Sequence, residues 1–356
     1  MKDAARRDLF HWVGMDVAKA TFDAAMVLSH QHYPDTPLRD IPGATFARSR
    51  EGVAKFLTWL DAFDVNPDEV RVVMEATGRY SSELAVWLLE IRPALCPAIA
   101  PPAYTAAFIK SLGVRNKTDR LEARALGFYG VERTPIPYEP MSAERAELRE
   151  LNRYRDQLVR QRTAMKNRRH ETCTSAFIQK NQTKRLRLLT GDITRVEQAM
   201  KELIEAHPEL KRDMELLCTI YGIAFLTAAT VLAELGDLRR FTYARQLTAF
   251  TGMSPSHRQS GTSIHGRSRL SKQGNPRIRQ ALYLSAMIAI KGDTPFRRIY
   301  RKLIAQGKPR MVALVAIMRK QLILMRAILI SGKPYQPLGI TPSTRGKQHK
   351  KRINFA

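Results

Sequence analysis

The first 130 residues alternate between hydrophobic patterns with strand periods and patterns with helix periods. Apolar runs predict five strands, over Phe10–Val17, Thr21–Leu28, Thr45–Ser49, Val70–Ala76 and Cys96–Ala100. Apolar residues spaced three and four apart predict helices over Glu51–Phe63, Tyr80–Ile91, 102–112 and 119–130. Because three strands come first and strands then alternate with helices, we expect an α/β domain with a mixed sheet covered by helices.

A Pro-rich segment, Thr134–Pro140, predicts a linker to a second part with a helical pattern. Leucines among many charges over Ser142–Arg169, followed by a helical pattern over Gly191–Ala206, predict a charged helical hairpin or short coiled coil. A solvated helical spacer without an interface is the alternative. Helices are also expected from Asp213 onward, at 276–290 and at 309–330, with a loop rich in Gly, Ser and Arg at about 252–274.

These patterns divide the chain into four parts. We expect an α/β domain at 1–135, a linker and helical coiled-coil spacer at 136–212, a mainly α-helical domain with the serine-containing loop at 213–332, and a basic tail at 333–356. The apolar stretch Met311–Ile330 is interrupted by Arg319, Lys320 and Arg326, which favours a buried helix over a membrane span.

Charge separates the two halves of the chain more sharply than hydrophobicity does. Residues 1–140 hold 17 Lys and Arg against 18 Asp and Glu, whereas the rest of the chain holds 42 against 15, within a net charge of +26 over 356 residues. A near-neutral part beside a strongly basic one indicates a polyanionic partner, because each cation that contacts a phosphate releases condensed counterions. The composition therefore favours a nucleic-acid-binding protein.

Four acidic residues lie at the ends of predicted elements. Asp16 ends the first strand, Glu75 ends the buried strand, and Asp119 and Glu122 share one helical face. Carboxylates at the ends of apolar strands are costly to bury unless they are neutralised, and hard oxygen ligands suit Mg²⁺ or Mn²⁺. We therefore predict that these acids converge on divalent metal. The alternatives are that Asp119 caps its helix and that Glu122 is an ordinary solvated residue.

The basic half offers a candidate nucleophile and candidate phosphate contacts. Ser260 precedes a glycine in an acid-free loop, where its hydroxyl can be exposed and arginines can hold a phosphate, although Ser254, Ser256 and Ser263 are competitors. Gly222 lies in a turn that resembles a helix-hairpin-helix and could present backbone N–H groups to a phosphate; an ordinary turn in a helical core is the alternative. The residues expected to bind the nucleic-acid backbone are Arg258, Arg267, Arg269, Lys272, Arg277 and Arg279.

Three segments, GMDVAKATFD, VMEATGRY and NKTDRLEARAL, resemble the DEDD transposases of the insertion-sequence 110 family and the related Piv-type DNA invertases. The resemblance covers about residues 10–330 and implies a RuvC/RNase-H-like N-terminal domain. It also implies that the four acids are metal ligands and that Ser260 is the nucleophile that joins covalently to DNA. Glu122 is a departure, because the family usually has Asp at this position.

The resemblance also implies partners and a reaction. We expect a transposase or recombinase that cuts and rejoins DNA with Mg²⁺ (or Mn²⁺), guided by a bridge RNA transcribed from its element. We expect a homo-oligomer, a dimer or a tetramer, in the bacterial cytoplasm at the nucleoid, without a membrane. The three widely spaced cysteines agree with a reducing compartment. A RuvC-like nuclease that uses water and a non-enzymatic nucleic-acid-binding protein are the alternatives.

Overall fold

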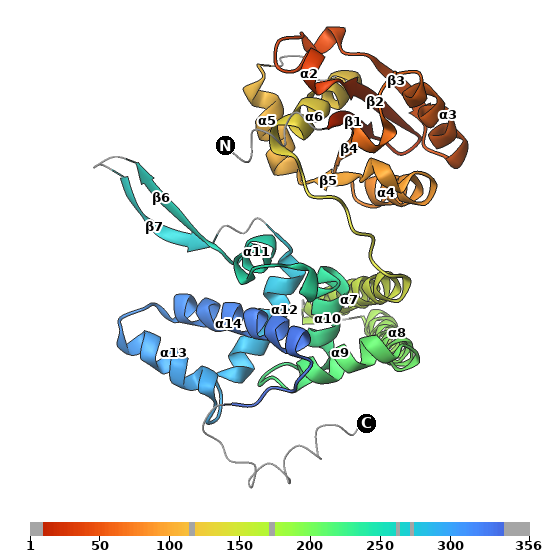
Figure 1. Cartoon of the computed structure of the whole chain (residues 1–356). Coiled ribbons are helices and arrows are strands. Elements are labelled where there is room, and N and C mark those ends of the chain that lie inside the picture. The colour runs from red at the N-terminus through yellow and green to blue at the C-terminus, as the bar shows by residue number, and fades with distance from the viewer. Residues whose placement is uncertain (1–9, 114–117, 171–174, 261–263, 271–273, 338–356) are drawn as a thin grey trace. The chain divides into compact units, whose positions relative to one another are not determined.

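The computed structural model describes residues 10–113, 118–170, 175–260, 264–270 and 274–337. The chain forms two compact units, Met1–Pro140 and Met141–Ala356 (Figure 1). The first unit is α/β and begins with a five-stranded sheet, and the second is mostly helical. The predicted fold class is confirmed to this extent, while the coiled-coil nature of the spacer stays a prediction.

The sheet of the first unit is mixed. Its strands are β1 (His11–Val17), β2 (Thr21–Val27), β3 (Gly43–Ala47), β4 (Val70–Glu75) and β5 (Ala98–Ala100), in the order β3-β2-β1-β4-β5. The first three strands pair antiparallel, whereas β4 runs parallel to β1 and β5 parallel to β4. This arrangement is consistent with the RNase-H-like fold that the sequence predicts.

Helices cover both faces of this sheet (Figure 1). On one face, Val13 and Met15 pack in a core with residues of α3 (Arg50–Asp61) and α4 (Arg79–Ile91). On the other, Trp12 and Val73 pack with residues of α5 (Pro102–Ser111) and α6 (Asp119–Arg133). The shorter helices are α2 (Ser29–His32) and three 3₁₀ turns at Leu38–Asp40, Pro67–Glu69 and Pro93–Leu95.

Glycines let α6 approach the sheet closely. A Cβ atom on Gly14 of β1 would lie 2.0 Å from the Ala123 carbonyl oxygen and 2.2 Å from the Gly127 nitrogen of α6. No side chain fits at such a distance, so backbone packs on backbone at this point. The contact fixes the start of α6 relative to the end of β1, where three of the four predicted acids lie.

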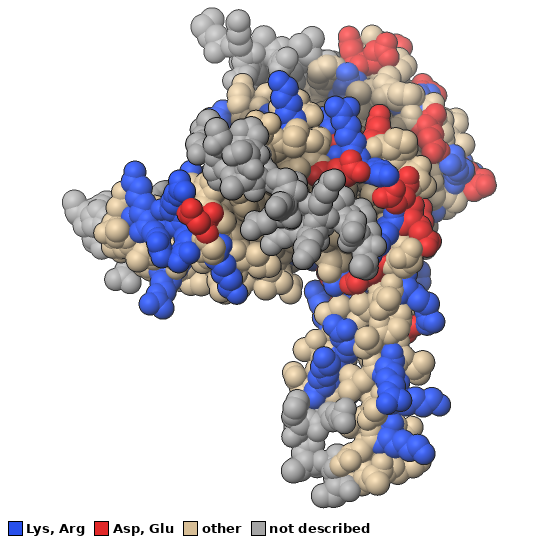
Figure 2. Space-filling model, turned by 90° about the horizontal axis from the view of Figure 1, so that it is seen from below, with Lys and Arg blue, Asp and Glu red and all other residues tan. Residues whose placement is uncertain are grey.

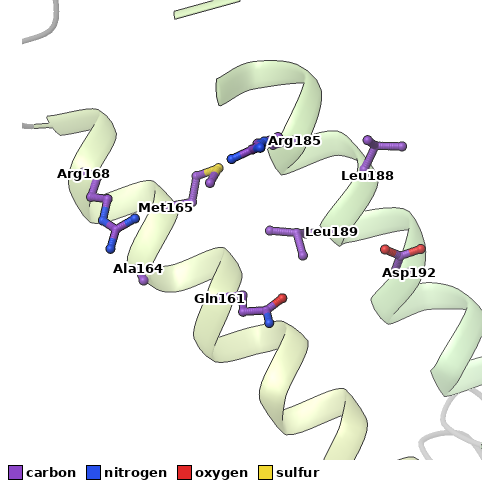
Figure 3. Close-up of a pocket in the computed structure, with 8 residues that line it drawn as sticks. All are labelled: Gln161, Ala164, Met165, Arg168, Arg185, Leu188, Leu189 and Asp192. Carbon is purple, nitrogen blue, oxygen red and sulfur yellow. The ribbon is translucent and has the colours of Figure 1, made fainter. Parts of the chain in front are cut away.

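The second unit begins with two long helices that pack together, α7 (Ala143–His170) and α8 (Ala176–Ala206). The prediction that the second helix starts near Gly191 was wrong, because residues 176–190 are almost wholly exposed or half-exposed and offer no apolar stripe to detect. Toward the far end of the pair, Met165 and Leu189 line a pocket between the helices that is flanked by Arg168 and Arg185 (Figure 3).

The remaining helices build the core of this unit. They are α9 (Pro208–Cys218), α10 (Phe225–Leu235), α11 (Ala244–Phe250), α12 (Pro276–Ala289), α13 (Pro295–Ala305) and α14 (Arg310–Ser331), with a 3₁₀ turn at Leu238–Arg240. Leu314, Ile317 and Met325 of α14 are almost fully buried, as expected for a core helix. Among the described residues, no helix combines the length and apolarity that crossing a bilayer requires.

The loop predicted at 252–274 is in part a β-hairpin, so this prediction was wrong in form. β6 (Pro255–Ser260) pairs antiparallel with β7 (Ile264–Leu270), and the hairpin extends away from the helices of its own unit (Figure 1). The signal was missing because these strands carry Ser, His, Arg and Gln instead of alternating apolar residues. Gly274 lies against the backbone of Phe250–Gly252 and so closes the neck of the hairpin.

Candidate active site

Asp16 and Glu75 end two neighbouring parallel strands. Met15 of β1 is in register with Met74 of β4, so the acid that follows each methionine lies at the same edge of the sheet and on the same face. That face is the one covered by α6, because Gly14, two residues before Asp16, contacts this helix directly. The side chains of Asp16 and Glu75 are partly buried there.

The other two predicted acids lie in the first turn of α6. The Thr118 hydroxyl accepts a hydrogen bond from the Leu121 N–H at 3.3 Å, so Thr118 caps the helix. The alternative role of Asp119 as the cap is therefore wrong. Asp119 is exposed and Glu122 is half-buried, and both follow the cap on the side of the helix that faces the end of β1.

Electrostatic repulsion links these carboxylates. Burial, followed in order of size by the charges of Glu122, Asp119 and Glu75, raises the pKa of Asp16 from 3.8 to about 6. The site therefore gathers negative charge around Asp16, which favours binding of an external cation.

The four carboxylates are chemically suited to bind a hard divalent cation. Four carboxylates supply only oxygen ligands, and their mutual repulsion at Asp16 would be relieved by positive charge. In the described part of the chain, however, no three acidic, His or Cys side chains lie close enough together to enclose a metal ion. The acids are thus within electrostatic range of one another without forming a closed ligand cage.

Two further residues at the site escaped the sequence analysis. The buried Thr105 of α5 donates a hydrogen bond to Glu75 Oε2 at 2.5 Å and orients that carboxylate. Asp23 of β2 pairs directly with Asp16 and is 8% exposed. A strand pairing drawn through the short turn after β1 would have placed Asp23 opposite Asp16, whereas Thr105 gave no signal in the sequence.

Asp23 is held by neighbours on two elements. Thr45 of β3 donates to its Oδ1 at 2.5 Å, and Arg120 of α6 approaches the same oxygen at 3.8 Å. Asp23 also contributes to the raised pKa of Asp16, although it is the weakest of the causes named for that shift. Its position ties the first turn of α6 to the sheet beside the predicted ligands.

The candidate nucleophile belongs to the second unit. Ser260 is the last residue of β6 and pairs with Ile264 across the hairpin, at the end farthest from the helices. Its side chain lies outside the described atoms, as do those of Ser256, Arg258, Arg267 and Arg269. Ser263 and Lys272 lie outside the described residues altogether.

Three residues predicted to bind phosphate have packing partners in the structure. Arg277 Nε lies 3.5 Å from Asp156 Oδ2, and Arg279 donates to the carbonyl oxygens of Thr251 and Gly274 at the hairpin neck. A Cβ on Gly222 would lie 2.4 Å from the Ser285 carbonyl oxygen, so close packing on α12 explains this glycine. Binding of nucleic acid by these residues stays a prediction.

A basic surface on α7 and α8 was not singled out from the sequence. Among the described residues between 157 and 191 there is no acid, and the exposed cations there are Arg160, Lys166, Arg168, Lys180, Lys184, Arg185 and Arg187. Figure 2 shows blue side chains along the surface of the second unit. Such a surface suits a phosphate backbone.

Two family models match the chain. The model of the DEDD transposases of IS110, described as a transposase, matches residues 13–178, which include all four acids. The model described as the transposase IS116/IS110/IS902 family matches residues 214–301, which include Ser260.

Curated relatives match over most of their length. The chain is 31% identical to the pilin gene-inverting protein of Moraxella bovis over 325 residues, which is 91% of this chain and 97% of the relative. It is 26% identical to the transposase for insertion sequence element IS1111A of Coxiella burnetii, over 74% of this chain and 79% of the relative. The similarity thus spans both compact units.

Proposed function

Because the chain belongs to the IS110 family of transposases, which makes it a DNA transposase or recombinase, we propose that it cuts and rejoins DNA strands with divalent metal and a serine nucleophile. The observation that carries this proposal is the negative site at the end of β1, where burial and three other predicted acids raise the pKa of Asp16. The other unit of the protein is strongly basic, so the chain combines a negatively charged site with a unit suited to bind phosphates.

Asp16, Glu75, Asp119 and Glu122 would hold the cation, Mg²⁺ or Mn²⁺. The cation would supply Lewis-acid polarisation of the scissile phosphate. Thr105 fixes the orientation of Glu75. The Gly14 contact with α6 keeps Asp119 and Glu122 near Asp16.

Ser260 would make the covalent link. Its Oγ forms a bond to the scissile phosphorus, the bond from phosphorus to the leaving strand oxygen breaks, and the serine proton passes to that oxygen. In the reverse step a strand hydroxyl attacks the same phosphorus and releases the serine, so phosphodiester bonds are exchanged without an external energy source. A hairpin that extends from its unit suits such an approach to DNA.

Arg258, Arg267, Arg269 and the exposed cations of α7 and α8 would bind phosphates. The same basic excess accommodates a guide RNA encoded by the element, and a homo-oligomer would let the acids and the serine come from different copies. The guide RNA rests on the family resemblance, and the homo-oligomer rests on the placement of the acids and the serine in different domains.

The test is strand breakage on a denaturing gel. The substrate is a labelled fragment from the end of the element that encodes the chain, supplied with RNA transcribed from that end and with Mg²⁺. Wild-type protein is expected to give broken strands and a slowly migrating protein–DNA adduct, and Asp16→Asn neither. Broken strands without any adduct would identify a nuclease that uses water, and binding without breakage by wild type would leave only a nucleic-acid-binding protein.

A further inference from the structure

A cluster of aromatic and arginine side chains lies on the surface between the Leu238–Arg240 turn and the end of α11. Tyr243 and Phe250 are 56% and 48% exposed, so about half of each aromatic side chain is open to solvent. Arg240 and Arg245 are exposed beside them. We call these four residues the α11 surface.

Both arginines lie over aromatic rings. The Arg240 guanidinium carbon is 5.0 Å from the centroid of the Phe241 ring and 5.6 Å from that of Phe250, and the Arg245 carbon is 5.1 Å from the centroid of the Tyr243 ring. Phe241 is buried and packs against Phe250 at 5.5 Å between centroids. The ring contacts hold each cation at the surface without neutralising its charge.

Other arginines of this unit are held differently. Arg153 forms two hydrogen bonds of 2.8 Å to Glu234, and Arg239 pairs with Asp213 at 2.5 Å. Within the described part of the chain, neither Arg240 nor Arg245 has an ion pair or a hydrogen bond to its side chain. Between Asp237 and Asp293 the sequence contains no acid. The α11 surface therefore carries two cations that no ion pair offsets among the residues that the structure describes.

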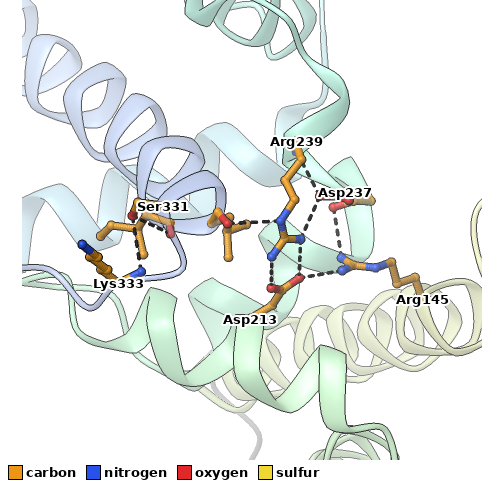
Figure 4. Close-up of polar contacts among 9 residues, drawn as sticks. Arg145, Asp213, Asp237, Arg239, Ser331 and Lys333 are labelled. Atoms are coloured by element: carbon orange, nitrogen blue, oxygen red, sulfur yellow. Dashed lines mark hydrogen bonds and ion pairs between the residues drawn. The ribbon is translucent and has the colours of Figure 1, made fainter.

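The backbone beneath the surface is firmly braced. Arg326 of α14 donates to the carbonyl oxygens of Phe241 and Thr242 at 2.7 and 2.8 Å. The Leu238–Arg240 turn is also held in place, because the buried Asp213 of α9 accepts hydrogen bonds from Arg239 of this turn and from Arg145 of α7 (Figure 4). The rings are thus presented on a scaffold that is already ordered before any ligand binds.

We propose that the α11 surface binds an unpaired nucleic-acid strand, with bases stacked on Tyr243 and Phe250 and phosphates held by Arg240 and Arg245. This inference rests on the proposed action on DNA and adds a site to it. Exposed rings interleaved with arginines are the combination that single-strand binding uses, because every base has a face that can stack.

An unpaired strand suits this surface better than a duplex does. In a duplex the faces of the bases are covered by neighbouring bases, so the exposed rings would have no base on which to stack. The arginines alone would be enough to bind the phosphates of a duplex. Phe250 lies only five residues before Pro255, the first residue of β6, and Figure 1 shows α11 at the base of the hairpin. A strand unpaired during exchange would thus be held near the element that carries Ser260.

The test measures binding of three fluorescein-labelled probes by anisotropy, with the full chain and EDTA. The probes are a thymidine 12-mer, a uridine 12-mer and a blunt 12-base-pair duplex. Tyr243→Ala is expected to weaken binding of at least one single strand by roughly 5- to 150-fold. Duplex binding should stay close to that of wild type. Comparison of the thymidine and uridine probes shows whether the surface prefers an unpaired DNA strand or an unpaired RNA strand.

Three variants control for damage to the fold. Tyr243→Phe keeps the ring and should bind as wild type does. Tyr154→Ala removes a similarly exposed tyrosine (50%) from α7 and should not change binding of any probe. Phe250→Leu keeps the packing on Phe241 but removes the stacking face, and should weaken single-strand binding alone. Thermal unfolding confirms that each variant is folded.

A probe with a fluorescent base analogue reports stacking directly. 2-Aminopurine in the thymidine or uridine strand should be quenched by wild type and by Tyr243→Phe, and not by Tyr243→Ala. Equal loss of duplex and single-strand binding, or no loss from Tyr243→Ala, would overturn the inference while strand breakage by wild type still supports the proposed function. Wild-type protein that binds neither single strand would also overturn the inference, and the strand-breakage assay tests the proposed function separately.

Discussion

Two carboxylates, one partly buried in the first unit and one buried in the second, have pKa values shifted in opposite directions. In the first unit, burial and the neighbouring acids Glu122, Asp119 and Glu75 raise the pKa of Asp16 to about 6. In the second unit, burial by itself also raises the pKa of Glu234. Hydrogen bonds from Arg153 and Asn275 outweigh that effect, and the net result is a lowered pKa.

The contrast separates structural acids from a functional site. Glu234 joins α7, α10 and the start of α12 through its partners, and Asp213 does the same for α7 and the turn before α11. Asp16 is surrounded by like charge, which costs stability unless a cation binds. The chain thus pairs Glu234 and Asp213 with arginines where they join helices, whereas the charged neighbours that shift the pKa of Asp16 are themselves acids.

The largest expected effect is that of Asp16→Asn on strand transfer. Loss of a residue that merely orients a metal ligand costs about 10- to 100-fold, so loss of a ligand should cost more than about a hundredfold. Asp35→Asn, an exposed acid of the same unit, is the matched control and should leave the rate unchanged. A strand-transfer assay with Mg²⁺ measures both, and full activity of Asp16→Asn would refute the site.

The same substitution should stabilise the folded protein. The pKa of Asp16 is higher in the folded state than its usual 3.8, so the folded state binds the proton more tightly than the unfolded state does. The folded protein therefore loses stability as pH rises from about 4 to 6 and Asp16 is ionised. Asp16→Asn should therefore raise Tm at pH 7 without divalent cations, and the difference should vanish near pH 4. A lower Tm at pH 7 would show that the carboxylate is a structural group.

The second unit should respond in the opposite way. Arg153→Ala leaves the carboxylate of Glu234, whose side chain is 1% exposed, without its main partner and should cost about 3 kcal/mol in the free energy of unfolding. Because the pKa of Glu234 is lowered in the folded state, this cost should be full at neutral pH and shrink as pH falls below about 4.5. Arg160→Ala on the same helix is the control, and denaturant unfolding is the measurement.

A smaller effect is expected where α6 meets the sheet. Gly14→Ala places a methyl group against the Ala123 carbonyl and should cost about 1–3 kcal/mol of stability, with reduced strand transfer as Asp119 and Glu122 move away. Gly191→Ala in α8, where a Cβ meets nothing within 4 Å, should instead stabilise by up to about 1 kcal/mol. Equal responses would contradict the close packing of α6.

The smallest effect is expected for Glu122→Asp. The family usually has Asp here, and the half-buried Glu122 lies in the first turn of a well-capped helix. Strand transfer with Mg²⁺ should change by less than about tenfold. Complete inactivation, with Tm unchanged, would mean that the longer side chain is required by the geometry of the site.

Strong periodicity explains what the sequence predicted well. The strands around Asp16 and Glu75 and the helix after Thr118 carry clear apolar patterns, and the structure has them within a few residues of the predicted bounds. The contacts of Asp23 and Thr105 were missed because they depend on strand pairing and on packing of α5, which no local pattern encodes.

The second unit was harder to predict for a related reason. Its hairpin and the first half of α8 carry polar and basic residues on almost every face, so neither a period of two nor one of 3.6 emerges. The short helix α11 and the basic helix α13 were not predicted either. The dense charge of these segments obscures the hydrophobic signal on which element prediction depends.

The most direct test of the central claim is the chemical identity of the protein–DNA link. Wild-type protein reacted with its element-end DNA in Mg²⁺ is digested with protease and nuclease, and the modified peptide is sequenced by mass spectrometry. We predict a nucleotide attached through phosphate to Ser260, absent from Asp16→Asn protein. An adduct on Ser254, Ser256 or Ser263, or strand exchange with no adduct at all, would contradict the assignment of Ser260 as the nucleophile.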